Sequence, residues 1–160
     1  MRALLALTAV TWLALLILAP VLPVPIAATL YALGSRICHQ RPERSFHLFA
    51  AQLPVCARCA GIYAGAAAGS LLLLLSARVR DQLLRYSRRT VLLAGALPTL
   101  ITITSEWSGA WAGGNDARAA AGVPLGLAVA FVVARAAATL HYGECVPRRP
   151  IANNRPLTLI

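Results

Sequence analysis

The sequence contains no lysine: its fifteen basic residues are all arginines, and only five acidic residues oppose them, giving a formal charge of +10. Aromatic residues are also scarce, at 6% of the chain, and they are not interleaved with the arginines. Nucleic-acid-binding surfaces combine a basic patch with interleaved aromatic residues, so the charge alone does not indicate a nucleic-acid partner. The chain also lacks a GxSxG element, a phosphate-binding glycine loop and an HExxH helix, which leaves the enzyme classes built on them without support.

What the sequence does contain is long apolar runs. Four stretches stand out: Leu4–Ala19, Ala57–Ala77, Thr90–Thr104 and Ala119–Leu140. A helix needs about 20 apolar residues to cross a bilayer, so the third stretch is short unless Ser105–Trp107 extend it. Lipid offers no partners for unpaired backbone groups, which favours helices over strands. The sequence therefore predicts an all-α polytopic membrane protein with four transmembrane helices, and a lipid bilayer as its surroundings.

We expect one membrane domain over residues 1–142, followed by an irregular basic tail over residues 143–160. Pro20, Pro23 and Pro25 break the chain after the first stretch, and residues 26–37 are apolar enough for a short interfacial helix. A signal peptide is the alternative interpretation of the first stretch. The prolines stand where a small-residue cleavage site is expected, which favours a transmembrane helix.

Small residues mark helix faces that allow close approach. Gly61, Gly65 and Gly69 recur at steps of four in the second stretch, and Gly122 and Gly126 repeat the spacing in the fourth. Such rows let helix backbones pack closely in a membrane. We expect the first row to pack against a helix of the same chain, or to mediate a homo-oligomer.

The arginine distribution predicts an orientation. Residues 78–89 carry five arginines against one aspartate, and the tail is also basic. The positive-inside bias places both segments, and hence both termini, in the cytoplasm of a cell-membrane protein. The segment between the first two stretches is then extracytoplasmic. This segment fits imperfectly because it also carries arginines, namely Arg36, Arg41, Arg44 and Arg58.

Soft ligands concentrate in the polar segment between the first two stretches. Cys38 and His39 open it, and Cys56 and Cys59 form a CxxC pair at the predicted start of the second helix. Helix N-termini and nearby arginines favour the thiolate form. Zinc prefers four nitrogen or sulfur ligands, so these four residues predict a transition-metal site, with zinc first and iron or copper after it. His47 is the alternative histidine.

Two other interpretations of the cysteines stay open. One is a thiol–disulfide relay that passes electrons to a quinone, because a CxxC pair at the outer start of a helix in a bundle resembles the arrangement of vitamin K epoxide reductase and of bacterial membrane disulfide oxidoreductases. The other is a structural disulfide in an oxidising compartment. An odd number of cysteines in the segment counts against the second interpretation.

Polar residues at the same predicted end of the bundle complete a composite site. A carboxylate or guanidinium group near lipid is unfavourable unless it is paired or hydrated, so we expect Arg118 to pair with Glu106 or Glu43, and Asn115 to hydrogen-bond the cysteine segment. The simpler alternative is that these residues only cap helices and mark the water boundary. The candidates for holding the ligands in place, or for replacing one of them, are His47, Gln40, Glu43, Arg44, Glu106, Asn115 and Arg118.

Two strings in this segment carry a family resemblance. They are Cys-His-Gln-x-Pro-Glu-Arg-Ser-Phe from Cys38 and Pro-Val-Cys-Ala-Arg-Cys-x-Gly-Ile-Tyr-x-Gly from Pro54. The sequence resembles a prokaryotic family of predicted membrane proteins, catalogued as domain of unknown function twenty eighty-five. The family also tends to carry Asn, Arg and Gly before its last helix, which here are Asn115, Arg118 and Gly122. Ala60 and Ala121 stand where the family often has threonine. The resemblance implies a shared site, and neither a metal nor a redox role follows from it.

Overall fold

The structure is a computed structural model that describes residues 1–144, apart from the side chains of Leu84 and of residues 139–144. Cys145 and the rest of the predicted tail lie outside the described residues. The elements in chain order are α1 (Arg2–Leu18), η1 (Ala19–Val21), α2 (Val24–Ile37), η2 (Pro42–Arg44), β1 (Ser45–Leu48), β2 (Ala51–Cys56), α3 (Ala57–Leu75), α4 (Ala77–Leu84), α5 (Arg88–Trp107) and α6 (Asn115–Glu144).

Four of these helices are long and apolar enough to cross a membrane. They comprise Arg2–Val21, Ala57–Leu75, Arg88–Trp107 and Asn115–Ala138. The four predicted transmembrane helices are confirmed, including the extension of the third to Trp107. The predicted interfacial helix is also present as α2, and α6 continues to Glu144, two residues past the boundary expected at Tyr142.

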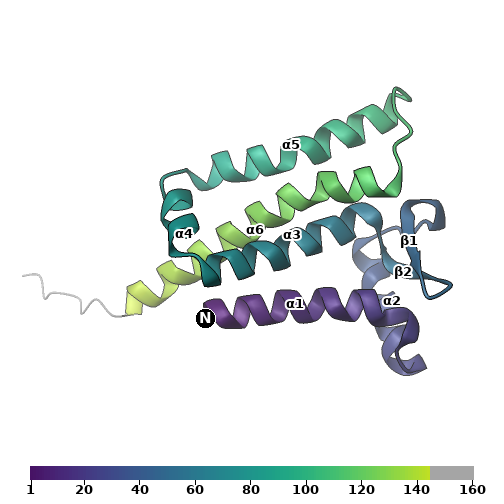
Figure 1. Ribbon diagram of the computed structural model, residues 1–160, viewed down its shortest axis with the longest axis horizontal. Coiled ribbons are helices and arrows are strands. Elements are labelled where there is room, and N and C mark those ends of the chain that lie inside the picture. Colours follow the sequence, from purple (N-terminus) through teal and green to yellow (C-terminus); the bar gives the residue numbers. More distant parts are fainter. Residues whose placement is uncertain (145–160) are drawn as a thin grey trace, which may run out of the picture.

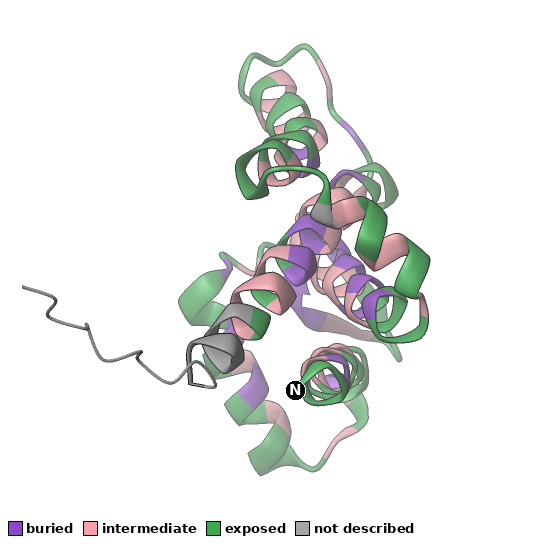
Figure 2. Cartoon of the chain, turned by 90° about the vertical axis from the view of Figure 1, so that its left-hand side faces the viewer, coloured by how far each residue is buried: buried purple, intermediate pink, exposed green. Residues whose placement is uncertain are grey.

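The four long helices lie side by side along the length of the molecule (Figure 1). The central pair is α3 and α6, with α1 packed against α3 and α5 packed against α6. Burial is concentrated where α3 meets α6, while the outward faces of the helices are exposed (Figure 2). Many of the exposed side chains are large and apolar, such as Leu7, Leu75 and Leu93. This is the pattern of helices whose outer surface contacts lipid instead of water.

Glycines set the close packing of the central pair. A Cβ at Gly61 would overlap the carbonyl of Ala119, and one at Gly65 would overlap the carbonyl of Val123. The predicted packing role is confirmed. Within the chain, α6 packs against this face, and a homo-oligomer through it stays a prediction. On α6, Gly126 makes the reciprocal contact with the carbonyl of Ile62.

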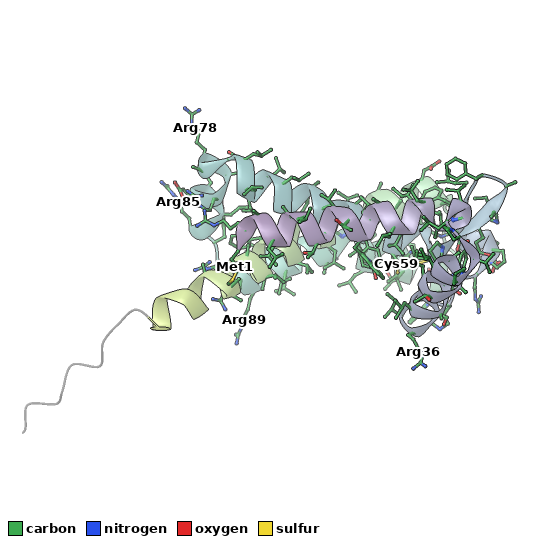
Figure 3. All side chains as sticks on the ribbon, turned by 90° about the horizontal axis from the view of Figure 1, so that it is seen from below. Met1, Arg36, Cys59, Arg78, Arg85 and Arg89 are labelled. Carbon is green, nitrogen blue, oxygen red and sulfur yellow. The ribbon has the colours of Figure 1, made fainter. Side chains whose placement is uncertain are left out.

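The two ends of the bundle differ. Met1, Arg78, Arg85 and Arg89 lie at one end and Cys59 lies toward the other (Figure 3). The 78–89 segment and the N-terminus therefore share an end, as the arginine pattern predicts. At the opposite end, α2 and the two strands gather beyond α1 and α3 (Figure 1).

A small antiparallel hairpin, formed by β1 and β2, lies between α2 and α3. It is the one β structure within the described residues and adds to the predicted all-α fold; α4, in the segment expected as a loop, is a further helix that was not predicted. Phe49 and Ala50 form its two-residue turn with φ values of 53° and 62°, as a type I′ turn requires. The hairpin reverses the chain and pairs Ser45 with Cys56, which returns the CxxC pair to the neighbourhood of Cys38.

Candidate metal centre

Three local structures position the three cysteines. Cys38 follows the last residue of α2, and its backbone N–H donates to the carbonyl of Gly34 at 2.9 Å. Cys56 ends β2 and is the N-cap of α3, and Cys59 lies in the first turn of that helix. A CxxC pair at a helix start places both sulfurs on one side of the first turn, because residues three apart share a helix face. The hairpin brings this side of α3 next to the segment that carries Cys38.

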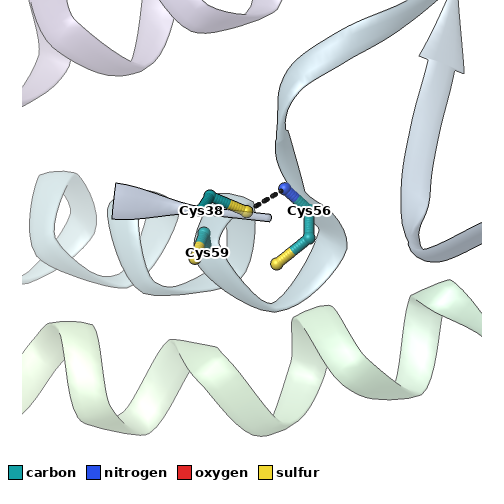
Figure 4. A group of neighbouring side chains, drawn as sticks. All are labelled: Cys38, Cys56 and Cys59. Carbon is teal, nitrogen blue, oxygen red and sulfur yellow. Dashed lines mark hydrogen bonds between the residues drawn. The ribbon is translucent and has the colours of Figure 1, made fainter. Parts of the chain in front are cut away.

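The three sulfurs form a compact group. All three lie within 4.8 Å of one another, and the backbone N–H of Cys56 donates to the sulfur of Cys38 at 3.1 Å (Figure 4). The cysteines are free thiols. In a tetrahedral zinc site with Zn–S bonds near 2.3 Å, the sulfurs are about 3.8 Å apart. The largest separation that the group allows is about 1 Å greater than this value, so the group is close to the size of a three-sulfur metal site.

Polar side chains hold the segment that carries Cys38. Gln40 has a φ of 46° and donates from Nε2 to the carbonyls of Tyr31 (2.9 Å) and Pro54 (2.7 Å). Gln52 donates from Nε2 to the carbonyl of Gln40 at 2.6 Å, and the hydroxyl of Tyr31 donates to the carbonyl of Gln52. These bonds tie α2, the cysteine segment and β2 together. They satisfy backbone carbonyls in an irregular stretch, which would otherwise be unfavourable to bury.

Apolar and aromatic side chains pack against one side of the sulfur group. Cys38 is buried together with Leu16 and Val55, and the aromatic rings of Trp12 and Tyr63 pack against this cluster. The two rings meet edge to face at 6.1 Å between centroids. Apolar packing therefore covers one side of the sulfur group.

The sulfur group also changes thiol acidity. A hydrogen bond from the thiol of Cys59 lowers the pKa of Cys56 from its ordinary value to about 5, although partial burial acts in the opposite direction. Cys56 is therefore a thiolate at neutral pH. A thiolate is the form that binds metals and attacks disulfides.

A buried carboxylate organises the arginines around the sulfurs. Glu106, whose side chain is 5% exposed, accepts from Arg58 Nη2 at 3.0 Å and from Arg118 Nε at 2.9 Å. Arg44 Nη1 lies 3.5 Å from its second oxygen. The predicted pairing of Arg118 is thus with Glu106, while Glu43 is exposed and forms no ion pair within the described part of the chain.

Asn115 connects this network to the cysteine segment. Its Nδ2 donates to the carbonyl of Ser45 at 3.1 Å, and its Oδ1 accepts from Arg118 Nη1 at 3.0 Å. Ser45 pairs with Cys56 in the hairpin. A continuous chain of contacts therefore runs from Glu106 to the strand that ends in Cys56, and the predicted contact of Asn115 with the cysteine segment is present.

A cavity of about 460 Å³ opens beside the sulfurs. All three cysteines line it, together with His39 and Gln40. Its other walls are cationic or apolar and consist of Ile37, Arg41, Arg44, Arg58, Ile62, Trp107 and Arg118.

The structure thus assembles most of the predicted site residues. His39 lines the cavity but is not one of the three residues whose ligand atoms lie within 4.8 Å of one another. His47 lies exposed on β1 and, like Glu43, does not line the cavity. Arg58, which the sequence offered as an arginine beside the thiols and as one that a folded site could hold, was not among the predicted site residues, and neither was Gln52. The position of Arg58 inside the CxxC pair was the available clue.

Comparisons with known proteins agree with this architecture. The profile of the family described as Predicted membrane protein (DUF2085) matches residues 38–132, more than half of the chain. The chain belongs to this family. It is also 32% identical to an uncharacterised protein of Methanocaldococcus jannaschii over 108 residues, which is 68% of each chain. An uncharacterised protein of Methanothermobacter thermautotrophicus is 38% identical over 98 residues, 60% of this chain and 83% of the relative. No solved structure matches.

Proposed function

We propose that this membrane protein binds one transition-metal ion, zinc first and iron or copper after it, through Cys38, Cys56 and Cys59. The observation that carries the proposal is the gathering of three sulfurs within 4.8 Å from two separate parts of the chain. The acidic thiol of Cys56 adds support, because zinc requires the deprotonated form.

The cavity supports a fourth coordination position on the open side of the sulfurs. His39 lines the cavity and is the preferred fourth protein ligand. With His39 bound, the ion has a closed four-ligand shell and serves to fix the cysteine segment over the bundle. With water or a substrate in its place, the site has three protein ligands and an open position, as catalytic zinc sites do.

Elemental analysis of the full chain, purified in detergent without added metal, tests the proposal. We expect about one metal ion per chain in the native protein, and its loss in Cys38→Ser, Cys56→Ser and Cys59→Ser. His39→Ala should weaken metal retention, whereas His47→Ala, which changes an exposed histidine in the same segment, should not. A native protein that contains no metal and acquires none from a zinc buffer contradicts the proposal.

The lowered pKa of Cys56 and its hydrogen bond to Cys59 favour one second candidate, a thiol–disulfide relay with a quinone as electron acceptor. Mass spectrometry of protein alkylated under non-reducing conditions distinguishes the two functions. A Cys56–Cys59 disulfide that persists in metal-free native protein favours the relay. A disulfide that includes Cys38 and stays oxidised in the native protein favours a structural disulfide instead.

We also propose that the sulfur end of the bundle is extracytoplasmic and that the arginine-rich end is cytoplasmic. The exposed arginines between Ala77 and Thr90 support this orientation. The test is labelling of intact cells with an impermeant maleimide, followed by peptide mapping. His47→Cys in the hairpin should be labelled from outside, and Gln82→Cys in α4 only after the cells are permeabilised. The reverse pattern contradicts the orientation.

A further inference from the structure

The cavity beside the sulfurs carries an excess of positive charge. Four arginines line it: Arg41, Arg44, Arg58 and Arg118. Glu106 is paired with three of them, so four guanidinium groups face a single carboxylate. Glu43 and Asp116, the other carboxylates at this end, are exposed and form no ion pair among the described residues.

The arginines retain donors that Glu106 does not use. Arg58 Nε is buried and has no hydrogen-bond partner in the described part of the chain. The side chain of Arg44 is 40% exposed, and it contacts Glu106 through only one nitrogen. Arg41 forms no ion pair with any described residue. Guanidinium groups present their donors in a planar fork that matches oxyanions. The accessible donors of Arg44 and Arg41, and not the shielded Nε of Arg58, are therefore the ones available to an oxyanion in this cavity.

We propose that this cavity is a binding site for a phosphate group. Counting the Glu106 carboxylate and the Cys56 thiolate, which lines the same cavity, the four guanidinium groups leave an excess of two positive charges. This excess matches a phosphate, which carries up to two negative charges and offers several acceptor oxygens, better than it matches a singly charged carboxylate. The arginines approach from η2, from the start of α3 and from the start of α6, which suits a tetrahedral anion. The site adds a ligand to the protein beyond the metal, and its guanidinium groups hold a phosphate whether or not a metal is present.

The apolar part of the lining leaves two sources for the phosphate. Ile37, Ile62 and Trp107 line the same cavity, and Trp107 is 83% exposed at the end of a transmembrane helix. A phospholipid headgroup at the membrane surface can enter with its chains toward lipid. A free phosphate ion can enter from water. Both sources present the same group to the arginines.

Equilibrium binding of radiolabelled inorganic phosphate to the full chain tests the proposal. The protein is placed in nanodiscs of pure phosphatidylcholine, both as purified and after treatment with a chelator. We expect saturable binding at one site in both samples. Arg44→Gln and Arg41→Gln should each weaken it by about tenfold, as loss of one charge-assisted hydrogen bond does. Arg78→Gln, which changes an exposed arginine at the opposite end, should leave binding unchanged.

A second series with increasing phosphatidylglycerol in the nanodiscs separates the sources. If the headgroup occupies the site, the lipid competes with phosphate in the native protein and competes less in Arg44→Gln. If free phosphate is the ligand, affinity does not change with lipid composition. Either result supports the site. Three results overturn it: no saturable binding of either ligand, equal loss in Arg78→Gln and Arg44→Gln, or phosphate binding that disappears with the metal and ignores the arginine variants.

Discussion

Both ends of the helix bundle are rich in arginine, but the arginines at the two ends differ in exposure and in ion pairing. At one end, Arg78, Arg85, Arg88 and Arg89 are all exposed. Their segment contains one ion pair, Arg80–Asp81 at 3.4 Å, in which the aspartate side chain is 67% exposed. At the other end, Arg58 and Arg118 are 16% and 13% exposed and share a carboxylate that is 5% exposed.

The difference shows that arginine content alone does not reveal the role of a segment. Exposed arginines at the α4 end remain hydrated, as the proposed orientation with this end in the cytoplasm requires. At the sulfur end, Arg44, Arg58 and Arg118 pair with Glu106, whereas Arg36 and Arg41 are exposed. The ion pairs account for part of the imperfect fit of the charge pattern to the positive-inside bias, because Arg58 and Arg44 contact a buried carboxylate and are not free basic residues of a loop.

The first prediction concerns the acidic residue at each end. Glu106→Gln removes the carboxylate that three arginines share, and breaking a buried ion pair in this way costs about 3–5 kcal/mol. Asp81→Asn removes an exposed partner and should cost about 0.5 kcal/mol or less. Thermal unfolding in detergent measures both. Equal losses of stability in the two variants would contradict the difference between paired, largely buried arginines at one end and exposed arginines at the other.

The second prediction concerns the helix packing that joins the two ends. Near the sulfur end, Gly61 meets the backbone of α6, so Gly61→Ala forces the helices apart and should cost about 3 kcal/mol. Further along α3, a Cβ added at Gly69 would lie 3.0 Å from the Cβ of Ala130. Gly69→Ala should therefore cost about 1 kcal/mol, within the usual range for overpacking. Chemical denaturation checks the order, and a larger loss in Gly69→Ala would contradict this account of the packing.

The third prediction concerns metal affinity. Arg118 links Glu106 to Asn115 and thus to the strand that ends in Cys56. Losing a residue that supports metal ligands commonly costs about 10–100-fold in affinity, so Arg118→Ala should weaken metal binding by that factor. Competition with a chelator gives the affinity, and membrane fractionation confirms insertion. Arg89→Ala at the opposite end is the control, and a similar loss there would argue against a specific link.

The fourth and smallest effect is a change in the shape of a pH profile. In metal-free protein, the pKa of Cys56 near 5 makes its alkylation rate nearly constant above about pH 6. An ordinary thiol with a pKa of about 8.5 reacts faster as pH rises toward 8.5. Gln82→Cys on α4 supplies such a thiol among exposed arginines. Alkylation by iodoacetamide, followed by residue-specific mass spectrometry, compares the two. Parallel profiles would mean that the folded site does not make Cys56 acidic.

The sequence predicted the features whose signals are local. Apolar length was sufficient for the four transmembrane helices, and the prolines at 20, 23 and 25 separated α1 from α2. The pairing of Arg118 with a carboxylate, either Glu106 or Glu43, followed from the cost of leaving either charge alone near lipid, and the structure selects Glu106. In each case the constraint acts on the residue type and on its expected depth in the membrane.

The features that sequence reasoning missed depend on contacts between distant segments. The hairpin turn uses Phe49 and Ala50 in place of the Asn-Gly or Asp-Gly pairs that announce type I′ turns. The role of Arg58 depends on Glu106, 48 residues further along the chain. His47 was the alternative to His39 as a ligand, and only the hairpin register places it on an exposed strand away from the cavity.

The central claim is that three cysteines brought together by the hairpin hold a metal ion. X-ray absorption spectroscopy at the zinc edge, on native protein purified without added metal, tests it most directly. The account predicts three sulfur neighbours at about 2.3 Å and one nitrogen or oxygen neighbour at about 2.0–2.1 Å. The same measurement on Cys38→Ser should show fewer than three sulfurs. A native protein without zinc, iron or copper, or a zinc shell made only of nitrogen and oxygen, would contradict the account.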